Sequence, residues 1–289
     1  MSFLFACLLT LPYCPDVAHA LSPTDSVAAG RVQTAVVAPP DLASNDFDKG
    51  SLKGRLGRFI NPWKKDLDFP VDPTGSGRGR IARFHYVGKN GDQNRAFEFT
   101  YRRGWGEPIY FKGDFYFPVP TFGNDSVIRK LVYWQSHADY PKYKHGGLAT
   151  GRTVVHMRGP DLVVDATYNP APASGKTSDD VRTVETIATG LSPHRWYTLE
   201  VYQRMETGVG RRDGELEIWL DGKSVFSSDQ MTWSDSGWIG DRSGGPPFSG
   251  SDIYFEHFLV GEQMMRLNAS YDEYRYWDKV AFSTRRIGG

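Results

Sequence analysis

A glutamine and a histidine lie two residues apart in the segment 131–137, which reads Leu-Val-Tyr-Trp-Gln-Ser-His. Aromatic and β-branched residues alternate there with polar ones until a proline-containing loop begins, which predicts a strand. Side chains on a strand point alternately to its two faces, so Tyr133, Gln135 and His137 share one face. An amide that holds a carboxylate beside an imidazole that accepts a proton can bind and deprotonate an acidic sugar. An ordinary polar face is the alternative interpretation.

The loop that follows this strand adds polar and aromatic groups to the same end of the predicted sheet. Four of its residues are candidate substrate contacts: Tyr140, Tyr143, Lys144 and His145. The tyrosines and the histidine are also candidate proton donors.

The segment 95–102 alternates as a strand should, with Phe97, Phe99 and Tyr101 predicted toward the core. Glu98, Thr100 and Arg102 then lie on the opposite face. Arg102 is a candidate clamp for a carboxylate, and Glu98 can hold its guanidinium in place. A solvated surface salt bridge is the alternative.

Two further segments contribute candidate binding residues. His156 and Arg158 share one face of the segment 153–158 and can extend a basic cleft, although a paired structural histidine is the alternative. Tyr202 points away from the face of Leu199 and Val201, which makes it another candidate contact.

The strand signals that position these residues recur from Ile81 to the end of the chain without sustained helical periodicity. The Asp221-Gly222 pair predicts a tight hairpin turn between two of them. Aromatic residues make up 14% of the chain, and 31 glycines and 18 prolines supply turns. Many short strands without helices predict an all-β protein, built as a sandwich or a barrel.

Charge and cysteine content exclude several classes of function. The 289 residues carry 34 basic and 34 acidic side chains, so the chain lacks the basic excess of a general nucleic-acid binder. The only cysteines, Cys7 and Cys14, lie in an apolar N-terminal segment. A chain cleaved after that segment would have no disulfide, no cysteine-zinc site and no thiol nucleophile.

The N-terminal segment resembles an export signal. Residues 3–11 are apolar, and Ala18-His-Ala20 fits a small-x-small cleavage site. We therefore expect a signal peptide over 1–20, a linker or disordered lead-in over 21–45, and one folded domain over 46–289. The protein is expected to be secreted or periplasmic. No membrane span is expected, because a span needs about 20 apolar residues.

Three segments carry a resemblance to a known family. Tyr110–Pro118 leads into the Gln-Ser-His strand, Trp196–Arg204 pairs with Gly214–Lys223, and Tyr276–Gly288 closes the chain. Together they resemble the polysaccharide-lyase branch of the concanavalin-A-like jelly rolls. The resemblance implies a two-sheet antiparallel jelly-roll sandwich that cleaves a uronic-acid polysaccharide, such as alginate, glucuronan or heparin, by β-elimination.

The resemblance also implies roles for individual residues. Gln135 and Arg102 would neutralise the uronate carboxylate, His137 would remove the C5 proton, and a tyrosine would protonate the leaving oxygen. Tyr254 matches the first tyrosine of the Tyr-Phe-Lys-Ala-Gly-x-Tyr-x-Gln strand of alginate lyases, which makes it a candidate catalytic residue. Val260 replaces the second tyrosine, so the donor is left unassigned. Alternation puts Tyr254 and His257 on opposite faces unless a bulge intervenes.

No cofactor is expected, because the sequence has no zinc motif and no acidic calcium loop. Jelly rolls of this kind sometimes hold a structural calcium ion, for which Asp46, Asp48 and Asp278 are the candidates. The expected partner is an acidic polysaccharide and the expected state a monomer. A non-catalytic carbohydrate-binding module is the alternative function. Hydrolysis ranks lower, because it needs two carboxylates that flank the bond, whereas Glu215 and Glu217 lie two residues apart on one face beside an exposed hairpin turn.

Overall fold

A computed structural model describes residues 39–61, 66–87, 91–118, 128–138, 151–167, 182–208, 211–233, 253–261, 263–267 and 272–287. Val36–Gly289 forms one compact unit. The other unit, Met1–Ala35, falls outside the described residues, as do the predicted signal peptide and most of the predicted lead-in. The described residues contain no helix, and hence none long and apolar enough to cross a membrane.

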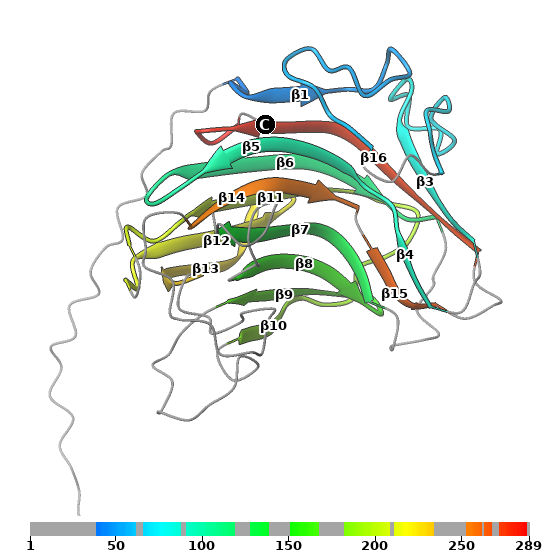
Figure 1. Cartoon of the computed structure of the whole chain (residues 1–289). Helices are drawn as coiled ribbons and strands as arrows, with labels where there is room; N and C mark the ends of the chain where they lie inside the picture. The colour runs from blue at the N-terminus through cyan, green and yellow to red at the C-terminus, as the bar shows by residue number, and fades with distance from the viewer. Residues whose placement is uncertain are drawn as a thin grey trace, which may run out of the picture. The chain divides into compact units, whose positions relative to one another are not determined.

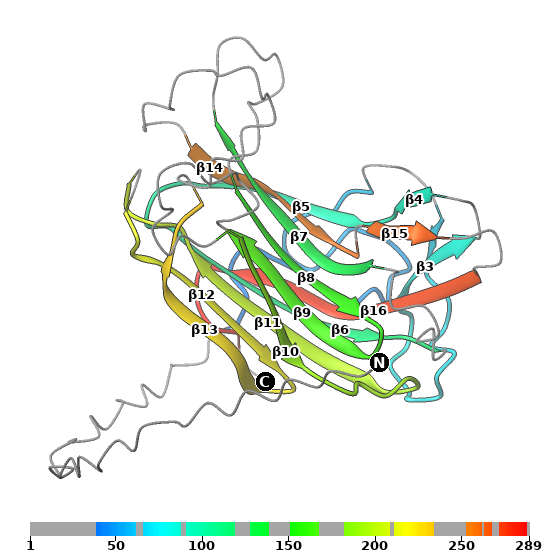
Figure 2. The ribbon, with the colours of Figure 1, turned by 90° about the horizontal axis from the view of Figure 1, so that it is seen from below.

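The strands form two antiparallel sheets that lie face to face (Figures 1 and 2). The first, called the β6 sheet, has the order β13-β12-β11-β6-β16-β3-β2, with β1 paired to β16. Its strands are β1 (Ala43–Asn45), β2 (Leu67–Asp68), β3 (Ala82–Val87), β6 (Pro108–Tyr116), β11 (Trp196–Arg204), β12 (Gly214–Leu220), β13 (Lys223–Met231) and β16 (Asp272–Ser283).

The second sheet, called the β7 sheet, has the order β10-β9-β8-β7-β14-β5, with β15 and β4 joined at one end of β7. Its strands are β4 (Gly91–Asn94), β5 (Phe97–Arg103), β7 (Ile128–Ala138), β8 (Arg152–Arg158), β9 (Asp161–Thr167), β10 (Arg182–Ala188), β14 (Ile253–Val260) and β15 (Gln263–Leu267). The predicted all-β sandwich is therefore confirmed.

Aromatic side chains from both sheets fill the space between them. Trp134 of β7 meets Phe258 of β14 edge to face at 5.2 Å and Phe111 of β6 at 6.3 Å. Trp277 of β16 is fully buried beside them. Such pairs add about 1 kcal/mol each beyond the apolar area they bury. The core therefore fixes which face of each strand points inward, and with it the residues that point out.

The hairpin predicted at Asp221-Gly222 is present between β12 and β13. Both residues have positive φ, 51° and 78°, as a type I′ turn requires. The Asp221 carboxylate also accepts a hydrogen bond from the backbone N–H of Thr198 at 2.8 Å. This bond ties the turn to the neighbouring strand β11.

Two details of the fold differ from the sequence-based expectations. The folded part begins before Asp46, because β1 pairs with the closing strand through Ala43 opposite Phe282. Tyr101, predicted to face the core, is 38% exposed and stacks on Phe99. The register of β5 against β14 shifts between Thr100 and Arg103, so simple alternation ends there.

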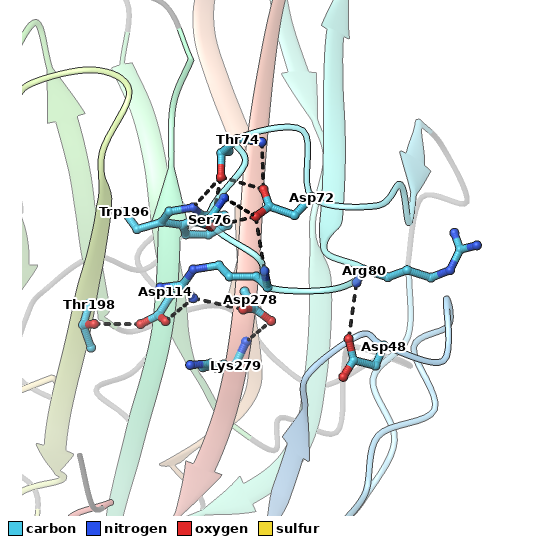
Figure 3. A network of polar contacts seen from close by, with 11 residues as sticks. Asp48, Asp72, Thr74, Ser76, Arg80, Asp114, Trp196, Thr198, Asp278 and Lys279 are labelled. Carbon is cyan, nitrogen blue, oxygen red and sulfur yellow. Dashed lines mark hydrogen bonds and ion pairs between the residues drawn. The ribbon is translucent and has the colours of Figure 1, made fainter.

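A segment that we call the strap, 72–80, crosses the outer face of the β6 sheet (Figure 3). Its first residue, Asp72, accepts hydrogen bonds from the side chains and backbone N–H groups of Thr74 and Ser76. Burial raises the pKa of Asp72, but these hydrogen bonds outweigh it and hold the pKa at about 2. These hydrogen bonds hold the first turn of the strap together. The Trp196 indole N–H also donates to the Thr74 hydroxyl at 3.1 Å, which connects the strap to β11.

Arg78 fastens the strap to the sheet. Its Nη1 lies 2.5 Å from Asp114 of β6 and 2.9 Å from Asp278 of β16, and its guanidinium stacks 4.2 Å from the Trp196 ring. Burial raises the pKa of Asp278 to about 6, although the bond from Arg78 opposes this rise. Two buried carboxylates therefore share one guanidinium.

This arrangement predicts a pH dependence of stability. A carboxyl whose pKa is higher in the folded protein than in the unfolded chain binds its proton more tightly when folded. Its contribution to stability therefore falls as pH rises through that range. Relative to Asp278→Asn, we expect the native chain to lose on the order of 2–3 kcal/mol of unfolding free energy between about pH 4 and pH 7.

Urea unfolding of both proteins across this pH range measures the difference. Asp229→Asn, at an exposed position of β13, is the matched control and should run parallel to the native chain. If the Asp278→Asn curve also runs parallel, Asp278 does not carry the raised pKa.

Candidate active site

The outward face of β7 is the one predicted from the sequence. Val132, Trp134 and Ser136 are fully buried between the sheets, whereas Tyr133 and Gln135 are half-buried on the other face. His137 belongs to the same strand and pairs in register with Tyr254 of β14. Its side chain falls outside the described residues.

A β-bulge in β14 decides which of its residues join this face. Phe255 pairs with Ser136 and His257 pairs with the next residue of β7, Gln135. Glu256 is therefore the extra residue of the bulge. Phe255, Phe258 and Val260 all pack in the core. The extra residue therefore puts Tyr254 and His257 on the same outward face, which strict alternation would forbid.

His257 and Glu98 form an ion pair on this face. His257 Nδ1 lies 2.6 Å from Oε1 of Glu98 on the neighbouring strand β5, and the Thr100 hydroxyl donates to the same oxygen at 2.9 Å. The Glu98 side chain is only 8% exposed, whereas that of His257 is 42% exposed. Glu98 is thus the buried member of the pair and His257 the one that reaches the surface.

The surroundings of His257 favour its charged form. The hydrogen bond to Glu98 raises the pKa of His257 above the usual 6.5, burial opposes this, and the charges of Glu98 and Glu256 add to the rise. Glu256 Oε2 lies 3.9 Å from Nε2. Two carboxylates therefore stabilise the imidazolium, one on each side of the ring.

Arg102 and Tyr254 also meet on this face. The Arg102 guanidinium lies 3.6 Å from the centroid of the Tyr254 ring, a cation–π contact between β5 and β14. Arg102 is exposed, and Tyr254 is only 4% exposed. The tyrosine proposed as catalytic therefore lies beneath the arginine proposed as a carboxylate clamp, and Glu98 contacts His257.

The neighbouring strands β8 and β9 extend the face. Arg152 pairs in register with Gln135 and forms a 3.1 Å ion pair with Asp165 of β9. Of the two contacts predicted on β8, His156 is buried, with 3% of its surface exposed, whereas Arg158 is exposed to solvent. Lys130 lies 4.2 Å from the ring of Tyr133 and adds another cation near Gln135.

One predicted contact lies elsewhere. Tyr202 is on β11 of the other sheet, where its hydroxyl donates to Glu215 Oε2 at 2.8 Å. That bond and its burial raise the pKa of Tyr202. The structure thus separates Tyr202 from Gln135 and His257. The predicted contacts Tyr140, Tyr143, Lys144 and His145 fall outside the described residues.

The three aspartates considered for calcium each contact a basic residue. Asp46 pairs with Arg55 at 3.3 Å, Asp48 accepts from the backbone N–H of Arg80 at 3.3 Å, and Asp278 pairs with Arg78. In the part of the chain that the structure describes, no group of three or more His, Cys, Asp or Glu could hold a metal ion. A structural calcium ion at these aspartates stays a prediction.

A hollow of about 620 Å³ opens away from these residues, on the outer face of the β6 sheet. It is lined by parts of β1, β6, β11 and β16, including Lys112, Asp114 and Lys279, and by Asp46, which follows β1. The residues predicted from the sequence to carry the chemistry do not lie there, because Gln135, His137 and Arg102 all belong to the β7 sheet.

Comparison with known proteins identifies the fold. No family model and no curated protein match the sequence. An endo-β-1,4-glucuronan lyase from the fungus Trichoderma reesei matches the structure with a TM-score of 0.53 at 16% identity, covering 83% of this chain and 94% of the lyase. A mutant alginate lyase in complex with an alginate trisaccharide matches with a TM-score of 0.52 at 12% identity, covering 86% and 99%. The fold is that of the jelly-roll polysaccharide lyases.

The resemblance that the sequence indicated is thereby confirmed at the level of this lyase fold. Sequence reasoning missed His257 as a member of the face, because the bulge that turns it outward has no glycine or proline to mark it. One signal was present in the sequence. Tyr254 and His257 are three residues apart, so a regular strand would put them on opposite faces, and only a bulge lets both point outward.

The Glu98–His257 pair leads to a testable prediction about the pKa of His257. We expect His257 to titrate above 6.5 and the substitution Glu98→Gln to lower its pKa, because the charged hydrogen-bond partner is lost. A histidine with a raised pKa stabilises the fold below its unfolded pKa. That contribution disappears as pH rises through the folded value.

NMR titration of the histidine ring protons measures both values. Asp272→Asn removes a similar partner, the carboxylate 2.7 Å from His85 Nε2 on the β6 sheet. It should leave the His257 titration unchanged. Equal His257 pKa values in the native chain and in Glu98→Gln would contradict the assignment.

Proposed function

We propose that the protein is an exported polysaccharide lyase that cleaves a uronic-acid-containing polysaccharide by β-elimination. The observation that carries the proposal is one outward face on which Arg102, Gln135 and His257 project from three adjacent strands. These residues offer a cation, an amide and an imidazole, the groups that a β-elimination needs beside an acidic sugar. Their host fold is shared with lyases that act on uronans.

Neutralisation of the substrate carboxylate is the first requirement. The C5 proton of a uronate becomes removable when the charge that develops on the carboxylate is stabilised by fixed donors. Arg102 and Gln135 are suited to this, because a guanidinium binds a carboxylate through two parallel hydrogen bonds and an amide adds a third. Tyr254 supports the guanidinium from below, so its role in this proposal is to position Arg102.

Removal of the C5 proton is the second requirement. His137 is the proposed base, since an imidazole has its ordinary pKa near neutral pH. Its strand position, opposite Tyr254 and two residues beyond Gln135, is compatible with this role. The proton passes from C5 to the imidazole while the C4–O4 bond breaks and the C4=C5 double bond forms.

We propose that the sugar units next to the reacting one contact basic residues on the outward face of β7 and β8. Lys130 over Tyr133, Arg152 beside Gln135, and Arg158 supply positive charge on β7 and β8. An acidic polymer lying across these strands would gain favourable electrostatic contacts at several sugar units. We take the active form to be a monomer, because the proposed site is drawn from a single chain.

The test is incubation with glucuronan, alginate and heparin while following the ultraviolet absorbance of the unsaturated product. The native chain should produce this absorbance with at least one uronan. Arg102→Gln and Gln135→Ala should each lower kcat/KM on the order of 100-fold, the usual effect of removing one donor to a developing anion.

Arg83→Gln and Gln230→Ala are the matched controls, because both positions lie on the β6 sheet, and both should retain full activity. No absorbance with any uronan, together with retained binding in a pull-down on an immobilised uronan, would replace the lyase by a carbohydrate-binding module. Loss of activity in the controls as well would place the site on the other sheet.

A further inference from the structure

A β-elimination leaves one chemical role that the proposed residues above do not fill. The departing O4 is a poor leaving group unless it receives a proton as the C4–O4 bond breaks. Arg102 cannot supply one, because a guanidinium does not deprotonate in proteins, and an amide such as Gln135 is not an acid. Tyr254 is 4% exposed and lies beneath the Arg102 guanidinium.

We propose that His257 is the general acid that protonates the leaving O4, and that Glu98 is its positioning residue. The inference rests on the proposed lyase function and assigns a role within it. It is carried by three features of the structure. These are the β14 bulge that turns His257 to the Gln135 face, the 2.6 Å contact between Nδ1 and Glu98, and the 42% exposure of the histidine side chain.

The contact with Glu98 fixes which ring nitrogen can act. Nδ1 donates its proton to Glu98 Oε1, so Nε2 is the ring nitrogen on the side away from Glu98 and carries the proton that the proposal assigns to the substrate. Glu98 is itself held in place, because its backbone N–H and C=O both bond to Ile60 and Thr100 donates to its carboxylate. A carboxylate behind an imidazole sets the ring orientation and stabilises the imidazolium, as in other acid–base pairs.

The carboxylates around the ring favour its protonated form. Glu98 on β5 and Glu256 on β14 both favour the imidazolium. The cations on the neighbouring strands are Arg102 on β5, which stacks on Tyr254, and Arg152 on β8, which pairs with Asp165. Gln135 faces His257 across the β7–β14 pair and carries no charge. The hydrogen bond to Glu98 is the largest single influence on the pKa of His257 and raises it.

The step balances without any added reactant. The base takes the C5 proton, the C5–H electron pair becomes the C4=C5 bond, and the C4–O4 pair leaves on oxygen. Nε2 gives its proton to that oxygen and His257 becomes neutral. The base loses its proton to water and His257 regains one from water before the next turnover.

Leaving-group dependence tests the assignment. His257→Gln should lower kcat on the order of 100-fold or more with the uronan that the native chain cleaves, the usual contribution of a general acid. With a synthetic uronate that carries nitrophenoxide at C4, the loss should shrink to a few-fold, because nitrophenoxide leaves without a proton. Equal losses with both substrates would overturn the role.

The pH profile gives an independent measurement. Activity of the native chain should fall at high pH as His257 loses its proton. In Glu98→Gln this limb should move to lower pH, because the carboxylate that raises the histidine pKa has become an amide. An unchanged alkaline limb in Glu98→Gln would remove Glu98 from the mechanism. Thermal unfolding of each variant checks that the fold is retained.

A second histidine–carboxylate pair provides the control. His85 lies 2.7 Å from Asp272 on the β6 sheet, and its ring stacks on Tyr274. His85→Gln and Asp272→Asn should leave both the leaving-group dependence and the pH profile unchanged. If the native chain cleaves no uronan, the lyase proposal itself fails. If it does and His257→Gln is equally active, only the role of His257 fails.

Discussion

The β-bulge at Glu256 is the constraint on which the candidate site depends. Core packing demands that Phe255 and Phe258 both point inward, and two inward residues three apart cannot lie on a regular strand. The extra residue satisfies the core and, by the same step, turns both Tyr254 and His257 outward. The buried aromatic residues therefore determine the composition of the surface face. The imidazole, the Arg102–Tyr254 contact and the Gln135 amide lie on one face because of this packing.

The buried carboxylates of the two sheets have different kinds of partner. On the β6 sheet, Asp278 and Asp114 are both paired with one guanidinium, and Arg78 also stacks on Trp196. On the β7 sheet, Glu98 is equally buried, but its partner is an imidazole that is nearly half exposed. A fixed cation gives a structural joint, whereas a titratable one gives a group whose proton can be exchanged with a substrate.

The sequence was sufficient for what depends on local pattern. Alternation identified the outward face of Gln135, and the Asp221-Gly222 pair identified its turn, because both signals lie within a few neighbouring residues. Long-range register was not predictable in the same way. Glu98 and His257 are 159 positions apart, and their contact requires register shifts that no turn residue announces. The strand β1 was missed because Ala43-Ser-Asn45 is short and polar and takes its structure from the partner strand β16.

The Arg78 joint has a consequence for the conditions in which the fold can persist. A bound ion occupies its site only as far as its concentration in the medium allows. Arg78 belongs to the chain that it fastens, so its effective concentration at the two aspartates is set by the length of the strap and stays the same at any dilution. The joint between the strap and the sheet therefore forms without any group taken from the medium. Protons compete with Arg78 for Asp278, whose burial raises its pKa.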